Sequence, residues 1–169
     1  MVLILGGTKV SAYVFTEWKF KGTPTIWVTY SWGSNLASEG TTIRTAFTTA
    51  INDWNNSQTK IKYYYVASSA NKLDSYYLSS SGDYGLTTTD YYQSTGYVDR
   101  FIARLNAGNQ DISTNNVARS AANHELGHPM GLNENNSSSY QSIMDQNRDR
   151  TTIYVPKSDD LNGINKLYE

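Results

Sequence analysis

The two histidines of this chain stand four residues apart, and this spacing constrains the local fold more than any other feature of the sequence. His124 and His128 lie in the segment His-Glu-Leu-Gly-His, residues 124–128. Positions i and i+4 share a face in an α-helix, where they differ by about 40° around the axis. The pair therefore predicts a helix that begins near Ser113 or Thr114, either of which is a good N-cap. We expect it to end by Gly131, and its apolar positions are Val117, Ala118, Ala121 and Leu126.

Two imidazoles placed in this way can share one Zn²⁺ ion. Glu125 is rotated by about 100° from His124, so its carboxylate would lie beside the metal and act as a general base toward bound water. The bare pentapeptide also occurs on ordinary exposed helices, so the pattern alone leaves both interpretations open. Three features favour zinc: both histidines lie here, Gly131 can turn the chain sharply, and Glu134 follows as a candidate third ligand.

Periodicity predicts the other elements. Residues 40–55 carry apolar side chains at helical spacing, namely Ile43, Ala46, Phe47, Ala50, Ile51 and Trp54. A last helix is expected after Pro156, with Ser158 as N-cap and an inward face of Leu161, Ile164, Leu167 and Tyr168. Strands are expected at 24–31, 60–67, 75–79, 85–92 and 97–105, and residues 132–156 are expected to be mostly loop. This order indicates an α+β fold.

Residues 124–134 resemble the long zinc signature of the metzincins, His-Glu-x-x-His-x-x-Gly-x-x-His. Ser142-Ile143-Met144 resembles the Met-turn of that clan, and residues 158–168 are similar to the closing helix of its matrixin-type members. The apolar stripe of residues 43–54 and the strand at Ile61 match the matrixin backing helix and the strand after it. The likeness runs from about residue 24 to residue 168.

The resemblance implies a single catalytic domain over residues 1–169. A twisted, mostly parallel five-stranded sheet, a backing helix and the active-site helix would form an upper lobe, about 1–131. The Met-turn and the final helix would form a lower lobe, about 132–169. The substrate would be a peptide or protein that lies extended along the edge strand of the sheet, for which Leu86–Tyr92 is the candidate.

The function implied by this resemblance is that of a matrixin-like zinc endopeptidase. His124, His128 and Glu134 would be the ligands of one catalytic zinc, and Glu125 would be the general base. Gly131 would turn the chain toward the third ligand. Met144 would form an apolar floor beneath the ligands, although a methionine alone is more often simply part of the core.

Two departures from the family pattern leave other functions open. Glu134 stands where the family has His or Asp; two histidines and a glutamate form a known catalytic set, but Glu134 could instead be a surface residue beside a weak two-histidine site. Pro129 lacks the N–H that would bond to the Glu125 carbonyl, at a cost of about 3 kcal/mol in a helix interior. The alternatives are a catalytically impaired metzincin-like binding module and a tyrosine-rich β module that binds carbohydrate by aromatic stacking. The second alternative leaves residues 121–134 unexplained.

Composition excludes several partners. The formal net charge of −1 gives no basis for binding nucleic acid, and the absence of cysteine excludes disulfides, thiolate zinc sites and a cysteine nucleophile. The apolar run Val2–Leu5 is too short for a signal segment or a membrane span. We expect a monomeric, secreted protein without membrane contact, whose export signal is not present in this chain.

Two further sets of residues are candidates for a functional role, although neither set belongs to a sequence motif. Asp83, Asp90 and Asp99 could hold Ca²⁺, although isolated aspartates in turns are more often solvated. Tyr140 or Tyr154 could stabilise a developing oxyanion, or both could simply pack against the core.

Overall fold

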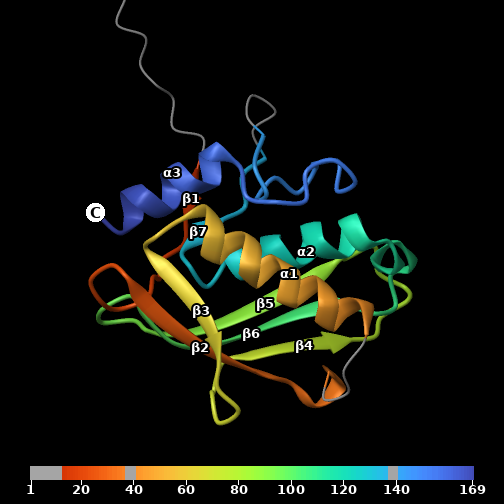
Figure 1. Ribbon diagram of the computed structural model, residues 1–169, viewed down its shortest axis with the longest axis horizontal. Coiled ribbons are helices and arrows are strands. Elements are labelled where there is room, and N and C mark those ends of the chain that lie inside the picture. Colours follow the sequence, from red (N-terminus) through yellow and green to blue (C-terminus); the bar gives the residue numbers. More distant parts are fainter. Residues whose placement is uncertain (1–12, 37–40, 137–140) are drawn as a thin grey trace, which may run out of the picture.

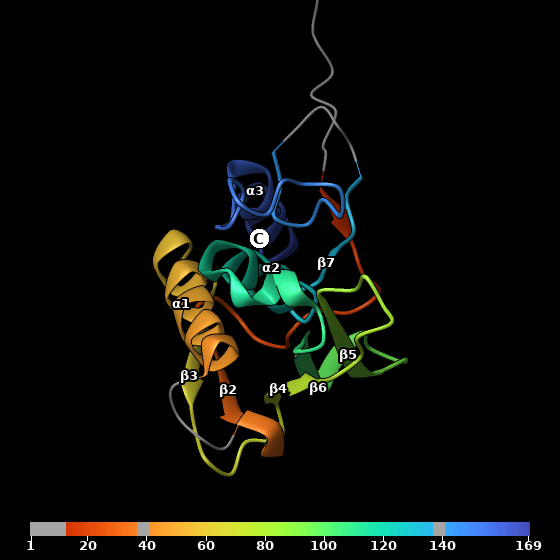
Figure 2. The same cartoon turned by 90° about the vertical axis from the view of Figure 1, so that its right-hand side faces the viewer.

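The computed structural model describes residues 13–36, 41–136 and 141–169. A five-stranded sheet carries helices α1 (Thr42–Ser57) and α2 (Asn115–Gly127) side by side on one face (Figure 1). Helix α3 (Ser158–Leu167) and the C-terminal loops lie on the side of these two helices remote from the sheet (Figure 2). The apolar run Val2–Leu5 and Tyr140 lie outside the described residues.

The sheet has the strand order β3-β2-β4-β6-β5. Its first three pairings are parallel, and only β5 runs antiparallel to its neighbour β6. The prediction of a mostly parallel five-stranded sheet in an α+β fold is therefore confirmed, and β5 is an edge strand. The strand bounds are β2 Ile26–Trp32, β3 Ile61–Tyr65, β4 Lys72–Tyr76, β5 Gly85–Tyr92 and β6 Tyr97–Asn106.

Helix α1 buries the predicted stripe against the sheet. All six apolar residues of that stripe are buried, and Phe47, Ala50 and Trp54 are fully so. The helix begins where Thr41 caps it, because the Thr41 hydroxyl accepts the Arg44 N–H at 3.1 Å. Its far end is joined to α2, since the Trp54 indole donates to the Asn123 carbonyl at 3.0 Å. Sequence periodicity thus predicted this helix and its buried face correctly.

Several boundaries differ from the prediction. Strand β4 lies three residues earlier than expected, because Leu73 and Ser75 alternate inward while Tyr77 and Leu78 are exposed. The N-cap of α3 is Lys157 rather than Ser158, and Asp160 accepts the Lys157 N–H at 2.7 Å. Of the predicted inward face of α3, two residues are buried and two are partly buried against the core.

A small antiparallel sheet was not predicted. Strand β1 (Val14–Phe15) pairs with β7 (Leu132–Asn133), which directly follows the turn after α2. Two-residue strands carry no periodicity that a sequence could reveal. Short 3₁₀ helices at Ser34–Leu36 and Gln110–Ser113 complete the described elements. No helix within the described ranges is long and apolar enough to cross a membrane.

Candidate metal centre

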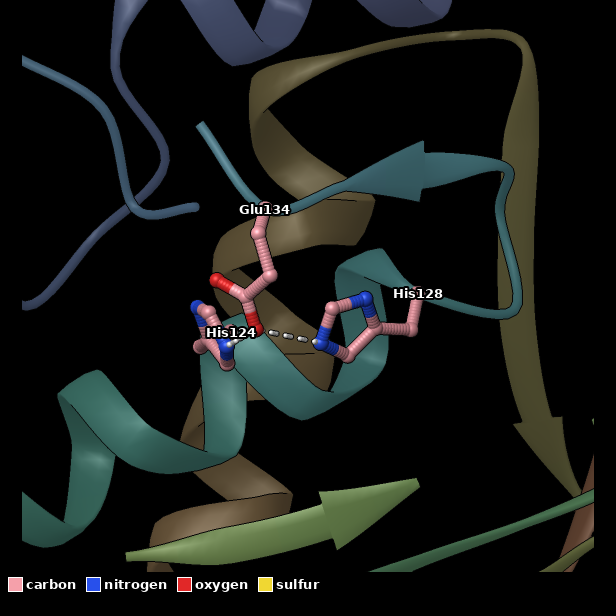
Figure 3. A group of neighbouring side chains, drawn as sticks. All are labelled: His124, His128 and Glu134. Atoms are coloured by element: carbon pink, nitrogen blue, oxygen red, sulfur yellow. Dashed lines mark hydrogen bonds and ion pairs between the residues drawn. The ribbon is translucent and has the colours of Figure 1, made fainter. Parts of the chain in front are cut away.

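Three predicted ligand side chains converge at the C-terminal end of α2 (Figure 3). His124 lies in the last turn of the helix, His128 caps it, and Glu134 directly follows β7. Oε1 of Glu134 is 3.2 Å from Nε2 of His124 and 3.6 Å from Nε2 of His128. The three ligand atoms lie within 4.8 Å of one another, and within the described ranges no other group of His, Cys, Asp and Glu does so.

Backbone carbonyls orient both imidazoles. Nδ1 of His124 lies 2.9 Å from the Ile143 carbonyl oxygen, and Nδ1 of His128 lies 3.1 Å from that of Leu132. A hydrogen-bond acceptor beside Nδ1 keeps the proton on that nitrogen, so that Nε2 of each ring faces Glu134. Metal-binding histidines are usually held by a second hydrogen bond of this kind.

Arg148 lies behind the His124 ring and is buried. Its Nη1 is 3.3 Å from Nδ1 of His124 but donates to the Asp145 carbonyl at 2.8 Å. A guanidinium can only donate, so Nδ1 would have to lose its proton to accept from it. The shorter contact to Ile143 favours the protonated Nδ1. Arg148 also donates to the hydroxyl and the carbonyl of Ser120, which fixes it in place.

The charge state of Glu134 suits a ligand. Burial alone would raise the pKa of Glu134, but hydrogen bonds from both histidines hold that pKa well below its usual value. Burial lowers the pKa of His128, whereas the hydrogen bond with Glu134 raises it. The net result is a pKa above the usual histidine value.

One buried oxygen of Glu134 indicates whether a metal ion suits the space between the three side chains. Oε2 is buried and has no hydrogen-bond partner in the described part of the chain. Leaving such an oxygen without a partner is costly, and a cation shared with the two imidazoles would satisfy it. Two imidazole nitrogens and one carboxylate form a donor set that zinc accepts in catalytic sites. The residues present therefore fit a zinc ion.

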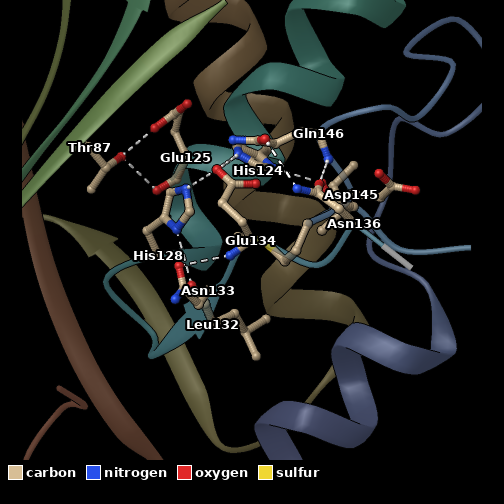
Figure 4. A network of polar contacts seen from close by, with 12 residues as sticks. Thr87, His124, Glu125, His128, Leu132, Asn133, Glu134, Asn136, Asp145 and Gln146 are labelled. Carbon is tan, nitrogen blue, oxygen red and sulfur yellow. Dashed lines mark hydrogen bonds and ion pairs between the residues drawn. The ribbon is translucent and has the colours of Figure 1, made fainter. Parts of the chain in front are cut away.

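Glu125 points away from the ligands and toward the start of β5 (Figure 4). The Thr87 hydroxyl lies 2.7 Å from Oε2 of Glu125 and 3.0 Å from its backbone oxygen. Gly85 leaves the room for this side chain, because a Cβ on Gly85 would lie 2.6 Å from Oε1 of Glu125. Glu125 is buried, with 5% of its surface exposed. Neither Thr87 nor Gly85 carried a signal in the sequence, since both reach Glu125 across about forty residues.

No protein-family model matches this chain. No curated protein matches it either. Among solved structures, it is similar to high choriolytic enzyme 1, a hatching enzyme zinc-protease from the medaka fish Oryzias latipes. The identity is 14%, the match covers 89% of this chain and 93% of the enzyme, and the TM-score is 0.54. The two chains share a fold. At this identity the likeness concerns the fold alone.

Pro129 does not disturb the helix in the way its position suggested. α2 ends at Gly127, so Pro129 lies outside it, and the expected helix-interior cost does not arise. The carbonyl that lacks a Pro129 N–H, that of Glu125, faces the Thr87 hydroxyl instead. The next carbonyls at this helix end are also met by side chains, with Tyr63 donating to Leu126 and Trp18 to His128.

Gly131 and Met144 support the end of α2. Gly131 has a φ of 100°, a left-handed conformation that glycine adopts readily, and it turns the chain three residues after the cap His128. Met144 has 2% of its surface exposed and packs under Gly127, where a Cβ would lie 2.5 Å from its sulfur. The methionine thus lies beneath the last turn of the helix that carries His124.

Two adjoining cavities open beside this centre, and both are bordered by Glu125, Glu134 and the first residue of β5. The smaller one, of about 370 Å³, is further lined by Tyr84, Ala121, His124 and Arg150. The larger one, of about 500 Å³, is further lined by Thr16, Trp18, Tyr76, Leu86, Thr87 and His128. The predicted edge strand therefore begins at the site.

The described residues do not support the calcium prediction. Asp90 pairs with Arg100 at 2.6 Å and Asp99 accepts the Tyr92 hydroxyl, whereas Asp83 accepts that of Ser81, so the three aspartates do not gather.

Among the tyrosines considered for an oxyanion, Tyr154 lies beneath the Arg119 guanidinium and lines neither cavity. Tyr76 does line the larger one, and the sequence did not single it out.

Proposed function

We propose that this protein is a zinc-dependent endopeptidase, with His124, His128 and Glu134 as ligands and Glu125 as general base. The observation that carries the proposal is the convergence of two oriented imidazoles on the partly unsatisfied Glu134 carboxylate. When bound, zinc would lower the pKa of a water molecule and polarise the carbonyl of a substrate. The finer assignment to a matrixin-like, secreted and monomeric enzyme of two lobes belongs to the same proposal.

The chain's own residues would move the proton. Glu125 lies at the border of both cavities, and its Oε2 is held by Thr87. It would take a proton from the attacking water and deliver it to the leaving amine. Burial and the nearby carboxylates of Asp83 and Glu125 raise the pKa of Tyr76, so its hydroxyl stays protonated and can donate a hydrogen bond in the larger cavity.

The substrate would bind as an added strand. β5 is an edge strand of the sheet, and its residues Gly85, Leu86 and Thr87 border the cavities beside Glu125. An extended peptide that pairs with this edge gains backbone hydrogen bonds, and the cavities receive its side chains. This arrangement suits peptide and protein substrates.

Cleavage of casein by the purified protein tests this proposal. We expect activity that a chelator abolishes and that added zinc restores, and a loss of at least about 100-fold in the Glu125→Ala variant, whose zinc content should equal that of the wild type. Zinc binding without cleavage would contradict the proposal and favour the non-catalytic binding module.

A further inference from the structure

We propose that Arg150 makes this site selective for substrates that carry a carboxylate next to the bond that is cut. The inference rests on the proposed endopeptidase function and adds a substrate class to it. It concerns the smaller cavity, where Arg150 shares the wall with His124, Glu125 and Glu134. A group that enters this cavity lies beside the candidate base and ligands, and therefore close to the reacting bond.

The Arg150 guanidinium is held in one plane. Its Cζ lies 3.8 Å from the centre of the Tyr84 ring, a cation–π contact. The Tyr84 hydroxyl donates to the Asp111 carboxylate at 2.9 Å, which fixes the ring. Nη2 of Arg150 donates to the Gln146 carbonyl at 3.0 Å. Such a fixed fork loses little freedom when a ligand binds.

The positive charge of Arg150 lacks a matching anion. Within the described ranges Arg150 forms no ion pair, its Nη1 makes no hydrogen bond, and its buried Nε has no partner. Two carboxylates near this wall are engaged elsewhere, that of Asp83 by the Ser81 hydroxyl and that of Asp111 by Tyr84. A guanidinium without a matching anion favours an incoming carboxylate, which can accept from the unbonded Nη1.

Arg148 adds a second positive charge behind the same wall. Its guanidinium is buried against the His124 ring and carries a positive charge. The two guanidiniums offset the negative charges of Glu125 and Glu134 across the cavity. Arg150 can present Nη1 and the second hydrogen of Nη2 to the two oxygens of a carboxylate, the geometry in which arginine binds this group most strongly.

A carboxylate beside the cut bond has two sources, an aspartate or glutamate side chain or a free C-terminus. Peptides that differ at one position distinguish them. We expect cleavage of a peptide library to enrich Asp or Glu at one position that flanks the cut bond, with kcat/KM about tenfold above that of the matching Asn or Gln peptide. If amidation of the C-terminus removes the preference instead, the source is the terminal carboxylate.

Variants then assign the preference to Arg150. Arg150→Gln should reduce the tenfold ratio to about 1, and Arg150→Glu should shift the preference to Lys or Arg at the same position. Lys166→Gln is the matched control, because it removes one positive charge on the exposed face of α3. Equal cleavage of acidic and amide peptides by the wild type, or a preference that survives in Arg150→Gln, would overturn the inference.

Binding measurements separate this result from a failure of the proposed function. Zinc-loaded Glu125→Ala protein should bind the acidic peptide about tenfold more tightly than its amide counterpart, and the additional Arg150→Gln change should remove the difference. If the wild type cleaves no peptide, the endopeptidase proposal fails, whereas the binding ratio still tests Arg150. Equal binding of both peptides would overturn the inference.

Discussion

At the scale of single residues, Thr87 connects two features that looked unrelated in the sequence. Its hydroxyl lies within hydrogen-bond distance of both the Glu125 carboxylate and the Glu125 carbonyl, which Pro129 cannot satisfy. The single hydroxyl proton is shared between these two acceptors, so one side chain links the candidate base to the carbonyl that the proline leaves open. Among the described residues the Thr87 hydroxyl donates only to Glu125 and to neither histidine, so its loss should leave the candidate ligands in place.

Replacing Thr87 by Val should lower kcat by about tenfold, because Val keeps the shape but removes the hydrogen bond that orients Glu125. Zinc content should not change. The matched variant Thr87→Ser keeps the hydroxyl and should restore most of the rate. The measurements are kcat and KM over a range of pH, together with metal analysis. A Thr87→Val protein with wild-type kcat and pH profile would show that Thr87 does not position the base.

At the scale of elements, the first residue of β5 sets the distance between the sheet and α2. A Cβ on Gly85 would lie 2.6 Å from Oε1 of Glu125 and 2.8 Å from the backbone oxygen of Arg104 on β6. Contacts this short force either the base or the strand to move. Gly85 is therefore a position where a methyl group is expected to displace the candidate base.

Gly85→Ala should reduce kcat/KM by roughly 100-fold, the low end of what a positioned general base contributes. The control is Gly82→Ala, where an added Cβ meets no atom within 4 Å. Peptide cleavage and zinc content of both variants provide the check. Similar activities of the two variants would refute a close packing of Glu125 on β5.

Helix α3 contacts the segment beside the candidate metal centre through Asp160. Its buried carboxylate accepts the Ser142 hydroxyl at 2.6 Å, the Ile143 N–H at 2.9 Å and the Lys157 N–H at 2.7 Å. Ile143 in turn accepts from His124. The Asp160 carboxylate thus fixes the segment that orients one candidate ligand, a role that its place in the first turn of a helix did not reveal.

Burial raises the pKa of Asp160 despite these hydrogen bonds, and this has a consequence for stability. The folded state then binds the proton more tightly than the unfolded state, whose aspartate pKa is about 3.9. The contribution of Asp160 to the free energy of unfolding is therefore largest below pH about 3.9 and decreases as pH rises through the raised pKa. Above that pKa it stays constant.

Urea denaturation at several pH values tests this direction of the pH dependence of stability. Asp160→Asn removes the titrating group, so the difference in unfolding free energy between wild type and variant should change with pH in this acidic window and be constant at neutral pH. A difference that does not depend on pH would contradict the raised pKa. Asp160→Ala should be less stable than Asp160→Asn by about 2 kcal/mol, because it leaves buried donors without an acceptor.

At the scale of the whole molecule, the candidate centre links helix α2 to the small β1–β7 sheet, whose strand β1 comes from the N-terminal part of the chain. His124 and His128 come from α2, and Glu134 comes after β7, which is held by β1 from the N-terminal segment. A metal that binds only the folded protein stabilises all of these parts together.

Zinc should therefore raise the unfolding temperature of the whole protein in one transition. At a free zinc concentration of 1,000 times Kd, the added stability is about 4 kcal/mol. Glu134→Ala should lose most of this increase, while Lys166→Gln should retain it. Thermal unfolding followed by circular dichroism gives the shift. An equal shift in Glu134→Ala would show that zinc binds elsewhere.

Local patterns were sufficient for most of the longer elements and for the two histidines. The stripe on α1 and the bounds of β5 follow from periodicity within one segment, and the spacing of His124 and His128 placed both on one helix end. The contacts of Thr87, Gly85, Asp160 and Arg148 could not be predicted, because they join residues brought together by the strand order and by loops. The two-residue strands β1 and β7 are too short to leave a pattern.

X-ray diffraction data collected at the zinc absorption edge, from crystals grown with zinc, test the central assignment most directly. The structure predicts one anomalous peak among Nε2 of His124, Nε2 of His128 and a carboxylate oxygen of Glu134. A zinc-loaded crystal with no peak at this position, or with Glu134 turned away from the metal, would contradict it.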